Sequence, residues 1–446
     1  MHKNKQSSPV CGIMELLKTI SHKQKELPCM NNYSTQLHGL KREIFGFCEK
    51  ICRGLHKPKR KLVEDVVFGV AAAQSCLLSE IARGLNEEIA LKKTIERLGR
   101  GLMNFDGIDT LRDNFAGLAK EHLSHAPTFL IDLSDIAKPY GKAFEALAKV
   151  HDGSTGGTVP GFWTLEIAAL GQKTHAPIPV YDRVFSSIED GYVSQNAELF
   201  TALDWLTKTF GGQGVHVFDR GFDRNIVYEY LLRDNLPFIV RADKQRNVIF
   251  KGKTLNILDA AKQYKGKCNL KIRGVDCKTS IACVKLPKLR DVPLFLVMVH
   301  GLGEEPLMLL TNLNSTDSKL SNAITKMYLL RWRVEENFRF KKIDFEIEGF
   351  RVRKLKAIRA LHRMVSLLSG FIALLSEQRE DFALPAQLVA ASKRIFAFSL
   401  QHFQRCFLHY AIADGIAFLL RRACVPLARP KPRAFDCSAQ LAFMGV

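Results

Sequence analysis

The stretch AITKMYLLRWRVEENFRFKKIDFEIEGF, from Ala323 to Phe350, decides how the rest of the chain is interpreted. It contains four polar residues at offsets of 0, +3, +7 and +14, namely Tyr328, Arg331, Glu335 and Lys342. In a helix of 3.6 residues per turn, these side chains point within an arc of about 60°. The pattern predicts one helix face that carries a carboxylate, two cations and a phenol. Such a carboxylate is either a solvated ion-pair partner or part of a site that acids elsewhere complete.

Two apolar segments earlier in the chain end in an aspartate. TFLID, which ends at Asp132, and VHVFD, which ends at Asp219, both have the composition of short buried strands. Either aspartate alone is equally well explained as a helix N-cap. Together with Glu335 they make a set of three carboxylates, and hard cations such as Mg²⁺ prefer oxygen ligands. Two such ions activate a water or hydroxyl and stabilise the leaving oxygen of a phosphodiester, so the sequence indicates this chemistry.

The charge of the chain points to a polyanionic partner. Its 65 Lys and Arg outweigh 45 Asp and Glu, which leaves a net charge of +20. Residues 1–62 hold 13 basic against 4 acidic residues, and residues 330–446 hold 20 against 10, so the two ends carry nearly all of the excess. Basic surface gains affinity by displacing counterions from phosphates, although charge alone does not separate DNA from RNA or an anionic membrane. We expect no secretory leader and no membrane span, since the longest apolar run, Val365 to Leu375, is about half the length that a span needs.

The segment 63–125 reads as helical. Two short amphipathic patterns, with a break at Asn86, fit either a helix-turn-helix DNA reader or a helical hairpin with a charged outer face. In the first case the candidate reader residues are the cations of the second helix, Lys92, Lys93, Arg97 and Arg100. The charge run His56–Lys61 just before it is expected to be solvated.

After Pro127 the pattern changes to short strands and helices in the order β-β-β-α-β-α-β. The residues after Asp132, LSDIAKPYGK, are expected to form a loop. The strands and helices that follow are expected at 162–170, 178–185, 197–210, 215–219, 224–233 and 237–242. An open α/β sheet of this kind aims residues at strand ends into its crevice. Residues 246–312 alternate apolar and polar positions, so we expect a β-rich insertion there.

These residues carry a family resemblance. The chain resembles the DDE transposases of bacterial insertion sequences, in the group (family four) marked by the signature Y-x2-R-x3-E-x6-K. Tyr328, Arg331, Glu335 and Lys342 satisfy this signature at every spacing. DRGFD, which begins at Asp219, resembles the motif around the group's second aspartate, and FLIDLSDIAK resembles the first. The first acid has a competitor in Asp135, three residues after Asp132.

The resemblance implies an RNase H-like core and a cut-and-paste reaction. Asp132, Asp219 and Glu335 would be catalytic and would hold two Mg²⁺ ions, for which Mn²⁺ substitutes. Arg331, Lys342 and Tyr328 would bind DNA phosphates. Hairpin formation at the DNA end is left open, because the insertion has no Trp in which a stacking aromatic could be recognised. Trp332 is expected to pack in the core.

The family also implies double-stranded DNA partners, namely the inverted repeats and the target, a homodimer on paired ends and a bacterial, nucleoid-associated cytoplasmic location. We expect an α/β fold with a β-rich insertion and helical regions at both ends. Its parts are a basic segment (1–62), a helical end-binding domain (63–125), the core (126–245 and 313–350), the insertion (246–312) and a C-terminal helical region for synapsis or dimerisation (351–446). Two alternatives remain, a nuclease that uses the same acids without strand transfer and a domesticated DNA-binding protein.

Overall fold

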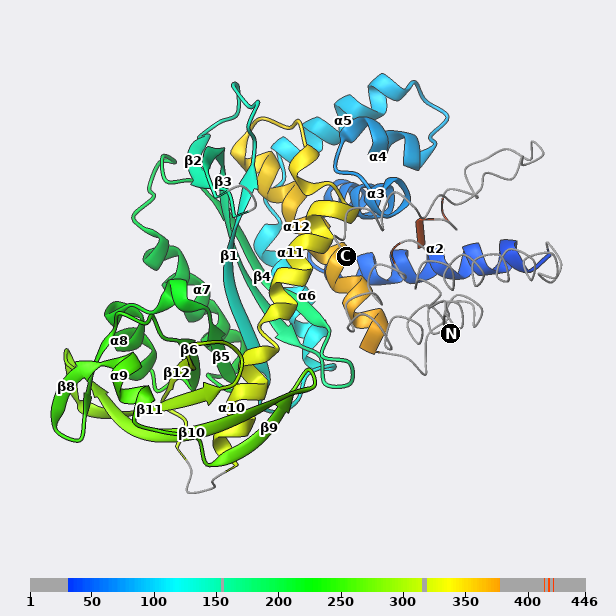
Figure 1. Cartoon of the computed structure of the whole chain (residues 1–446). Coiled ribbons are helices and arrows are strands. Elements are labelled where there is room, and N and C mark those ends of the chain that lie inside the picture. The colour runs from blue at the N-terminus through cyan, green and yellow to red at the C-terminus, as the bar shows by residue number, and fades with distance from the viewer. Residues whose placement is uncertain are drawn as a thin grey trace, which may run out of the picture.

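The computed structural model describes residues 31–153, 156–314 and 319–377, together with positions 413, 416, 417 and 420. A long, twisted sheet runs from a group of N-terminal helices at one end of the molecule to the strands of the insertion, which form its other end (Figure 1). Residues 1–30 and nearly all of 378–446 lie outside the described part, so the C-terminal region expected there is described only through its first helix.

The N-terminal helices precede the sheet. They are α2 (Asn31–Ile51), α3 (Lys57–Ala73), α4 (Leu78–Leu85), α5 (Leu91–Met103) and α6 (Ile108–Lys120). The break predicted at Asn86 is present, with this residue in the left-handed conformation (φ 48°) at the end of α4. The run at 56–61 is exposed or half-exposed, as expected, and most of it is helical, because α3 begins at Lys57 with a proline in its first turn, where the missing N–H costs no hydrogen bond. A domain boundary at residue 62 would therefore cut α3.

Five strands form the centre of the sheet. The elements from 128 to 241 are β1 (Thr128–Ala137), β2 (Ala148–His151), β3 (Thr158–Leu170), β4 (Pro177–Phe185), α7 (Gln195–Phe210), β5 (Val215–Phe218), the 3₁₀ turn η2 (Arg220–Phe222), α8 (Asn225–Arg233) and β6 (Phe238–Arg241). In the sheet the order is β4-β3-β1-β5-β6, with β3 antiparallel to both β1 and β4, and with β5 parallel to both β1 and β6. Three antiparallel strands followed by two parallel ones in this order constitute the RNase H-like topology.

The expected loop after Asp132 was wrong. β1 continues to Ala137 because its backbone pairs with β3 from Phe129↔Ala169 to Ala137↔Gly161. Asp132 therefore lies in the middle of its strand, whereas Asp219 follows directly after the end of β5. The short edge strand β2 was not predicted.

The insertion continues the same sheet. It comprises β7 (Asn247–Phe250), β8 (Lys253–Asn256), α9 (Ile257–Lys262), β9 (Cys268–Ile272), β10 (Val275–Leu286), β11 (Leu289–His300) and β12 (Leu307–Thr311). The prediction of antiparallel strands is confirmed, apart from α9. β12 pairs with β6, so the core and the insertion share an unbroken hydrogen-bonded ladder.

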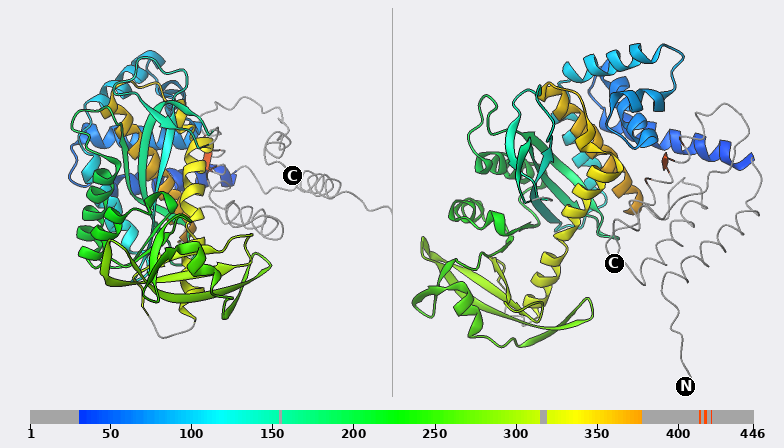
Figure 2. Two further views of the ribbon diagram at one scale, coloured as in Figure 1. Left: turned by 60° about the vertical axis from the view of Figure 1, so that its left-hand side comes forward. Right: turned by 45° about the horizontal axis from the view of Figure 1, so that its top comes forward.

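The stretch from Ala323 to Phe350 forms two helices instead of one. They are α10 (Leu320–Leu329) and α11 (Trp332–Asp344), followed by the turn η3 (Ile347–Gly349) and by α12 (Leu355–Glu377). A 3₁₀-type turn at Leu330 and Arg331 separates α10 from α11, although both residues keep nearly helical dihedral angles. The two helices run in nearly one direction from the insertion towards the N-terminal helices (Figure 2).

Opposite faces of the sheet pack against different helices. Alternate residues of β1 separate cleanly, with Leu130 in a cluster that includes Tyr328, Val334 and Phe338 of α10 and α11. Phe129 and Ile131 belong to the larger core with α7, α8 and the N-terminal helices. Helix α12 is long and apolar enough to cross a membrane, but 94% of its most apolar window is buried inside the protein, as in a core helix. The side chains of α12 pack within this chain, and the synapsis or dimerisation role expected of residues 351–446 stays a prediction.

Candidate active site

The three predicted acids come from three different elements and meet at one guanidinium. Arg331 donates from Nη1 to Asp132 Oδ2 at 3.0 Å and from Nη2 to Glu335 Oε1 at 2.5 Å. Its Nε lies 3.9 Å from Asp219 Oδ1. Because one planar cation reaches all three carboxylates, the structure brings the predicted acids together on the face of the sheet that α10 and α11 cover.

The turn between α10 and α11 gives Arg331 this position. Arg331 is the residue just before α11, and its side chain is only 10% exposed, so it lies under the two helices against the strands. Glu335 follows it by four residues, which places the two side chains on the same side of the helix. Glu335 and Asp219 remain about one-third exposed, at 34% and 36%, and are therefore accessible from solvent.

Burial dominates the electrostatics of Asp132. Burial, with smaller contributions from the nearby Asp219 and Glu335, raises the pKa of this carboxyl to about 7, although Arg331 lowers it. The same acids outweigh burial at Arg331 and raise the pKa of the guanidinium, so it stays charged. The arrangement is a concentration of negative charge that a cation must balance.

Tyr328 completes the cluster from the α10 side. Its hydroxyl donates to Asp219 Oδ1 at 3.4 Å, and its ring lies 5.9 Å from the Arg331 guanidinium. Burial raises the pKa of the phenol, so the hydroxyl is a donor at neutral pH.

Lys342, seven residues after Glu335 on α11, forms a second ion pair with Asp135. Lys342 Nζ lies 3.2 Å from Asp135 Oδ2 and 3.0 Å from Glu348 Oε1. The two acids outweigh burial and raise the pKa of the lysine. Asp135, the competitor for the first acid, is buried and already neutralised, whereas Asp132 is the acid of β1 that faces Arg331.

Two buried networks that hold the site were not predicted from the sequence. Glu166 of β3 has a fully buried side chain (0% exposed) that accepts from Asn337 and Lys341 of α11. Asn337 in turn accepts from Ser369 of α12, and Lys341 contacts Ser366 there. Because Glu166 lies beside Asp132 in register, this network fixes α11 against the strands that carry the acids. A carboxylate in the middle of the apolar segment FWTLEIAAL was the signal for it.

The second network anchors the turn that carries Asp219. Asp223 is almost fully buried and accepts from Tyr228 Oη at 2.6 Å and from the backbone N–H of Asp243 at 2.7 Å. Arg246 Nε lies 2.5 Å from it. The last residue of DRGFD therefore ties the end of β5 to the start of the insertion.

The candidate DNA-end reader residues are not equivalent. Arg97 is used inside the protein, where it lies 2.5 Å from Asp65 and 2.8 Å from Glu87. Lys92, Lys93 and Arg100 are exposed on α5 and are available to a partner, although Lys93 has Glu96 at 3.9 Å. The expectation for Trp332 was wrong, because its side chain is 42% exposed at the start of α11.

The ligand chemistry of the three acids suits a hard divalent cation, but their spacing in this structure is wider than such a site needs. Asp132, Asp219 and Glu335 supply only carboxylate oxygens, the ligands that Mg²⁺ prefers. Within the described residues, no three Asp, Glu, His or Cys side chains are yet close enough to one another to hold a metal ion. The acids are instead spaced around Arg331, which balances their charge.

A family model described as "Transposase DDE domain" matches residues 187–369, a segment that contains Asp219, Arg331 and Glu335 but begins after Asp132. The match supports a DDE transposase. Enzymes of this kind cleave nucleic acid, transfer strands and use divalent metal ions. DNA is their partner.

No curated protein matches the chain. Among solved structures, the chain is similar to a piggyBac transposase synaptic complex with hairpin DNA, determined by cryo-EM. The two share 10% sequence identity with a TM-score of 0.43, over 89% of this chain and 82% of the other.

Proposed function

We propose that this protein is a transposase that cleaves DNA at the inverted-repeat ends of an insertion sequence and joins the freed ends to target DNA by cut and paste. The observation that carries the proposal is the convergence of Asp132, Asp219 and Glu335 on Arg331, on the face of an RNase H-like sheet. Three acids from a central strand, the end of its parallel neighbour and a later helix suit phosphodiester chemistry with metal ions.

Asp132, Asp219 and Glu335 would hold the divalent ions, with two Mg²⁺ as the expected set and Mn²⁺ as a substitute. When bound, the ions supply an activated water or 3′-hydroxyl and charge stabilisation at the leaving oxygen. The protein supplies orientation, because Glu166 and Asp223 fix two of the three elements that carry these acids.

Arg331 has two possible partners, the three acids and a DNA phosphate. In this structure it neutralises the acids, but divalent ions would take over that charge balance. The guanidinium would then be free to bind a DNA phosphate in the bidentate manner that its planar fork favours. Tyr328 would donate a hydrogen bond to the same phosphate group, and Lys342 would act as a point charge after release from Asp135 or Glu348.

The remaining assignments complete the proposal. We assign end binding to the α3–α6 helices and target or end contacts to the basic faces. We also assign residues 246–312 to the β-rich insertion and dimerisation on paired DNA ends to residues 351–446. We propose a bacterial cytoplasm with nucleoid association as the location.

The test uses three isosteric variants, Asp132→Asn, Asp219→Asn and Glu335→Gln. Each is expected to lose Mg²⁺-dependent cleavage of a labelled inverted-repeat end while end binding in a gel-shift assay persists. The matched control is Glu336→Gln, because Glu336 neighbours Glu335 but pairs with Arg333 at 3.0 Å. Cleavage that survives in Asp132→Asn and disappears in Asp135→Asn would move the first acid to Asp135.

A second assay separates transposition from hydrolysis alone. Pre-cleaved ends with a free 3′-hydroxyl are offered with a circular target in Mg²⁺. Covalent joining supports the transposase, whereas cleavage without joining identifies a nuclease, and end binding without either reaction identifies a domesticated DNA-binding protein.

A further inference from the structure

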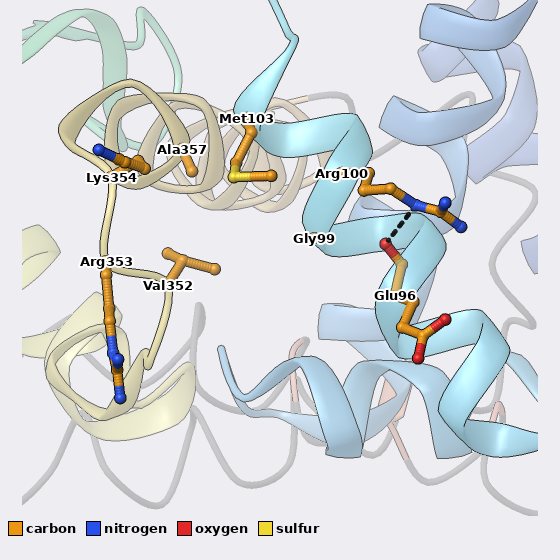
Figure 3. Close-up of a pocket in the computed structure, with 8 residues that line it drawn as sticks. All are labelled: Glu96, Gly99, Arg100, Met103, Val352, Arg353, Lys354 and Ala357. Atoms are coloured by element: carbon orange, nitrogen blue, oxygen red, sulfur yellow. Dashed lines mark hydrogen bonds between the residues drawn. The ribbon is translucent and has the colours of Figure 1, made fainter.

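A cleft lies between α5 and the segment that links η3 to α12. Its volume is about 490 Å³, and two stretches more than 240 residues apart in sequence line it, around Arg100 and around Arg353. Figure 3 shows Met103 and Val352 extending into the open space, whereas the side chains of Arg100, Arg353 and Lys354 extend from the two walls away from it, towards the surrounding surface. The cleft therefore has an apolar floor, and the cations on the surface beside it form a cationic rim.

The rim is accessible and weakly paired. Arg100, Arg353 and Lys354 are all exposed. Arg100 donates from Nε only to the backbone carbonyl of Glu96, at 3.4 Å, and Lys354 has Glu145 at 3.9 Å. Such exposed contacts contribute little, so the cations are available to an anionic partner.

The charge around the cleft is mostly positive. The segment RVRKLK (351–356) holds four cations and no acid, and all four are exposed. On the other wall, Lys92 and Lys93 of α5 are exposed in addition to Arg100. Glu96 also lines the cleft, but Lys93 lies 3.9 Å from its carboxylate. The surface thus favours an elongated polyanion over a single small anion.

We propose that this cleft binds the sugar-phosphate backbone of duplex DNA, with phosphates on Arg100, Arg353 and Lys354 and deoxyribose against Met103 and Val352. This inference rests on the proposed function, since it requires DNA as the substrate. Phosphates and sugars receive most protein contacts in DNA complexes, and a cationic rim over an apolar floor matches both parts of the backbone.

The cleft lies between the candidate reader helix α5 and the end of the helix that carries Glu335. Lys342 pairs with Glu348 of η3, and Arg351 begins just beyond η3, so the cleft adjoins the end of the helix that carries Glu335. Its other wall is α5, the candidate reader helix. A backbone held here is positioned between end recognition and the acids.

The experiment measures duplex binding by the full chain as a function of salt. The variant is Arg353→Ala with Lys354→Ala, and the control is Lys173→Ala with Lys208→Ala, which removes the same charge from exposed sites on other elements. A fluorescent duplex of random sequence is titrated between about 50 and 200 mM salt, because each lost phosphate contact lowers the slope of log K against log salt by about 0.9. The variant is expected to bind at least tenfold more weakly near physiological salt, with a slope lower by about two, whereas the control keeps the wild-type slope. Arg100→Ala is expected to lower the slope by about one.

Each outcome decides a different question. A wild-type slope in both cleft variants, with thermal unfolding unchanged, overturns the cleft as a DNA site while the proposed transposase stands. Absence of salt-dependent duplex binding by the wild type counts against the proposed function itself. If the cleft variants lose binding to polyglutamate but retain duplex binding, the partner is an acidic protein and the inference is wrong. The pair Arg353→Lys with Lys354→Arg keeps the charge and is expected to restore the slope, which guards against a folding defect.

Discussion

Lys341→Met tests whether the buried Glu166 network holds α11 in place. The Lys341 side chain is 2% exposed and that of Glu166 is 0% exposed, so neither charge is screened by water. Removal of the cation leaves Glu166 buried with Asn337 as its remaining described side-chain donor. Loss of one partner of a buried pair costs about 3–5 kcal/mol, because the other charge stays uncompensated.

A double-mutant cycle separates the interaction energy of Lys341 and Glu166 from the effects of each single substitution. Lys341→Met and Glu166→Leu are each expected to lower the free energy of unfolding by about 3–5 kcal/mol, whereas the double variant is expected to lie within about 1–2 kcal/mol of wild type. Urea denaturation followed by tryptophan fluorescence gives these values. In the double variant Asn337 would lose Glu166 as its acceptor and Ser366 would lose Lys341 as its donor, so part of the loss persists there.

The functional consequence distinguishes positioning from stability. If the network orients α11, the double variant folds but cleaves a DNA end more slowly than wild type, since Glu335 lies only two residues before Asn337. A Lys341→Met protein as stable as wild type would refute the buried pair. A double variant with wild-type stability and wild-type cleavage would refute the positioning role while leaving the pair itself intact.

Three further predictions follow from the same contacts. Lys342→Ala is expected to weaken strand transfer more than folding, because its ion pairs with Asp135 and Glu348 are partly solvated; an unchanged transposition rate would rule out its phosphate role. Since the pKa of Asp132 is raised to about 7, the folded state without metal binds more protons than the unfolded state between pH 4 and 7, so stability in EDTA falls as pH rises through this window, by on the order of 1 kcal/mol per unit. Asp132→Asn should flatten that dependence, and a flat wild-type profile would contradict the burial of this carboxyl. Asp223→Asn is expected to cost about 3 kcal/mol by leaving Arg246 without its anion, and to slow cleavage by loosening the turn at Asp219, as chemical denaturation and an end-cleavage assay would report.

The sequence predicted the elements of this fold better than their ends. The strands around Asp219 and the helices around Asn86 depend on local composition, and both were predicted correctly. β1 extends beyond Asp132 because β3 pairs with it through Ala137, and such a long-range partner leaves no local signal in LSDIA. The turn at Arg331 was not predicted because the change there is purely local and small. Its dihedral angles are close to helical, and only the hydrogen-bond pattern changes.

Side-chain roles were harder to predict than elements. The spacing of Arg331 and Glu335 correctly indicated a shared face, but it did not show that Arg331 also reaches Asp132 and Asp219 across the sheet. Trp332 was expected to be buried because tryptophan is large and apolar, yet burial depends on which side of α11 meets the strands. That orientation follows from Glu166 and Asn337, a contact between β3 and a helix 171 positions away.

The shared ladder between core and insertion has a mechanical consequence. β12 is bonded to β6, which is bonded in turn to β5, and Asp219 follows β5 directly. A force on the outer strands β10 and β11 would thus travel through stiff hydrogen-bonded rows to the second acid, with no hinge of loose chain between them. Asp223 fastens the same turn to Arg246 at the entry to the insertion, so the two routes form a closed loop of contacts. A contact made by the insertion would therefore reach Asp219 as a change in strand register or sheet twist, and not as a hinge motion of the insertion.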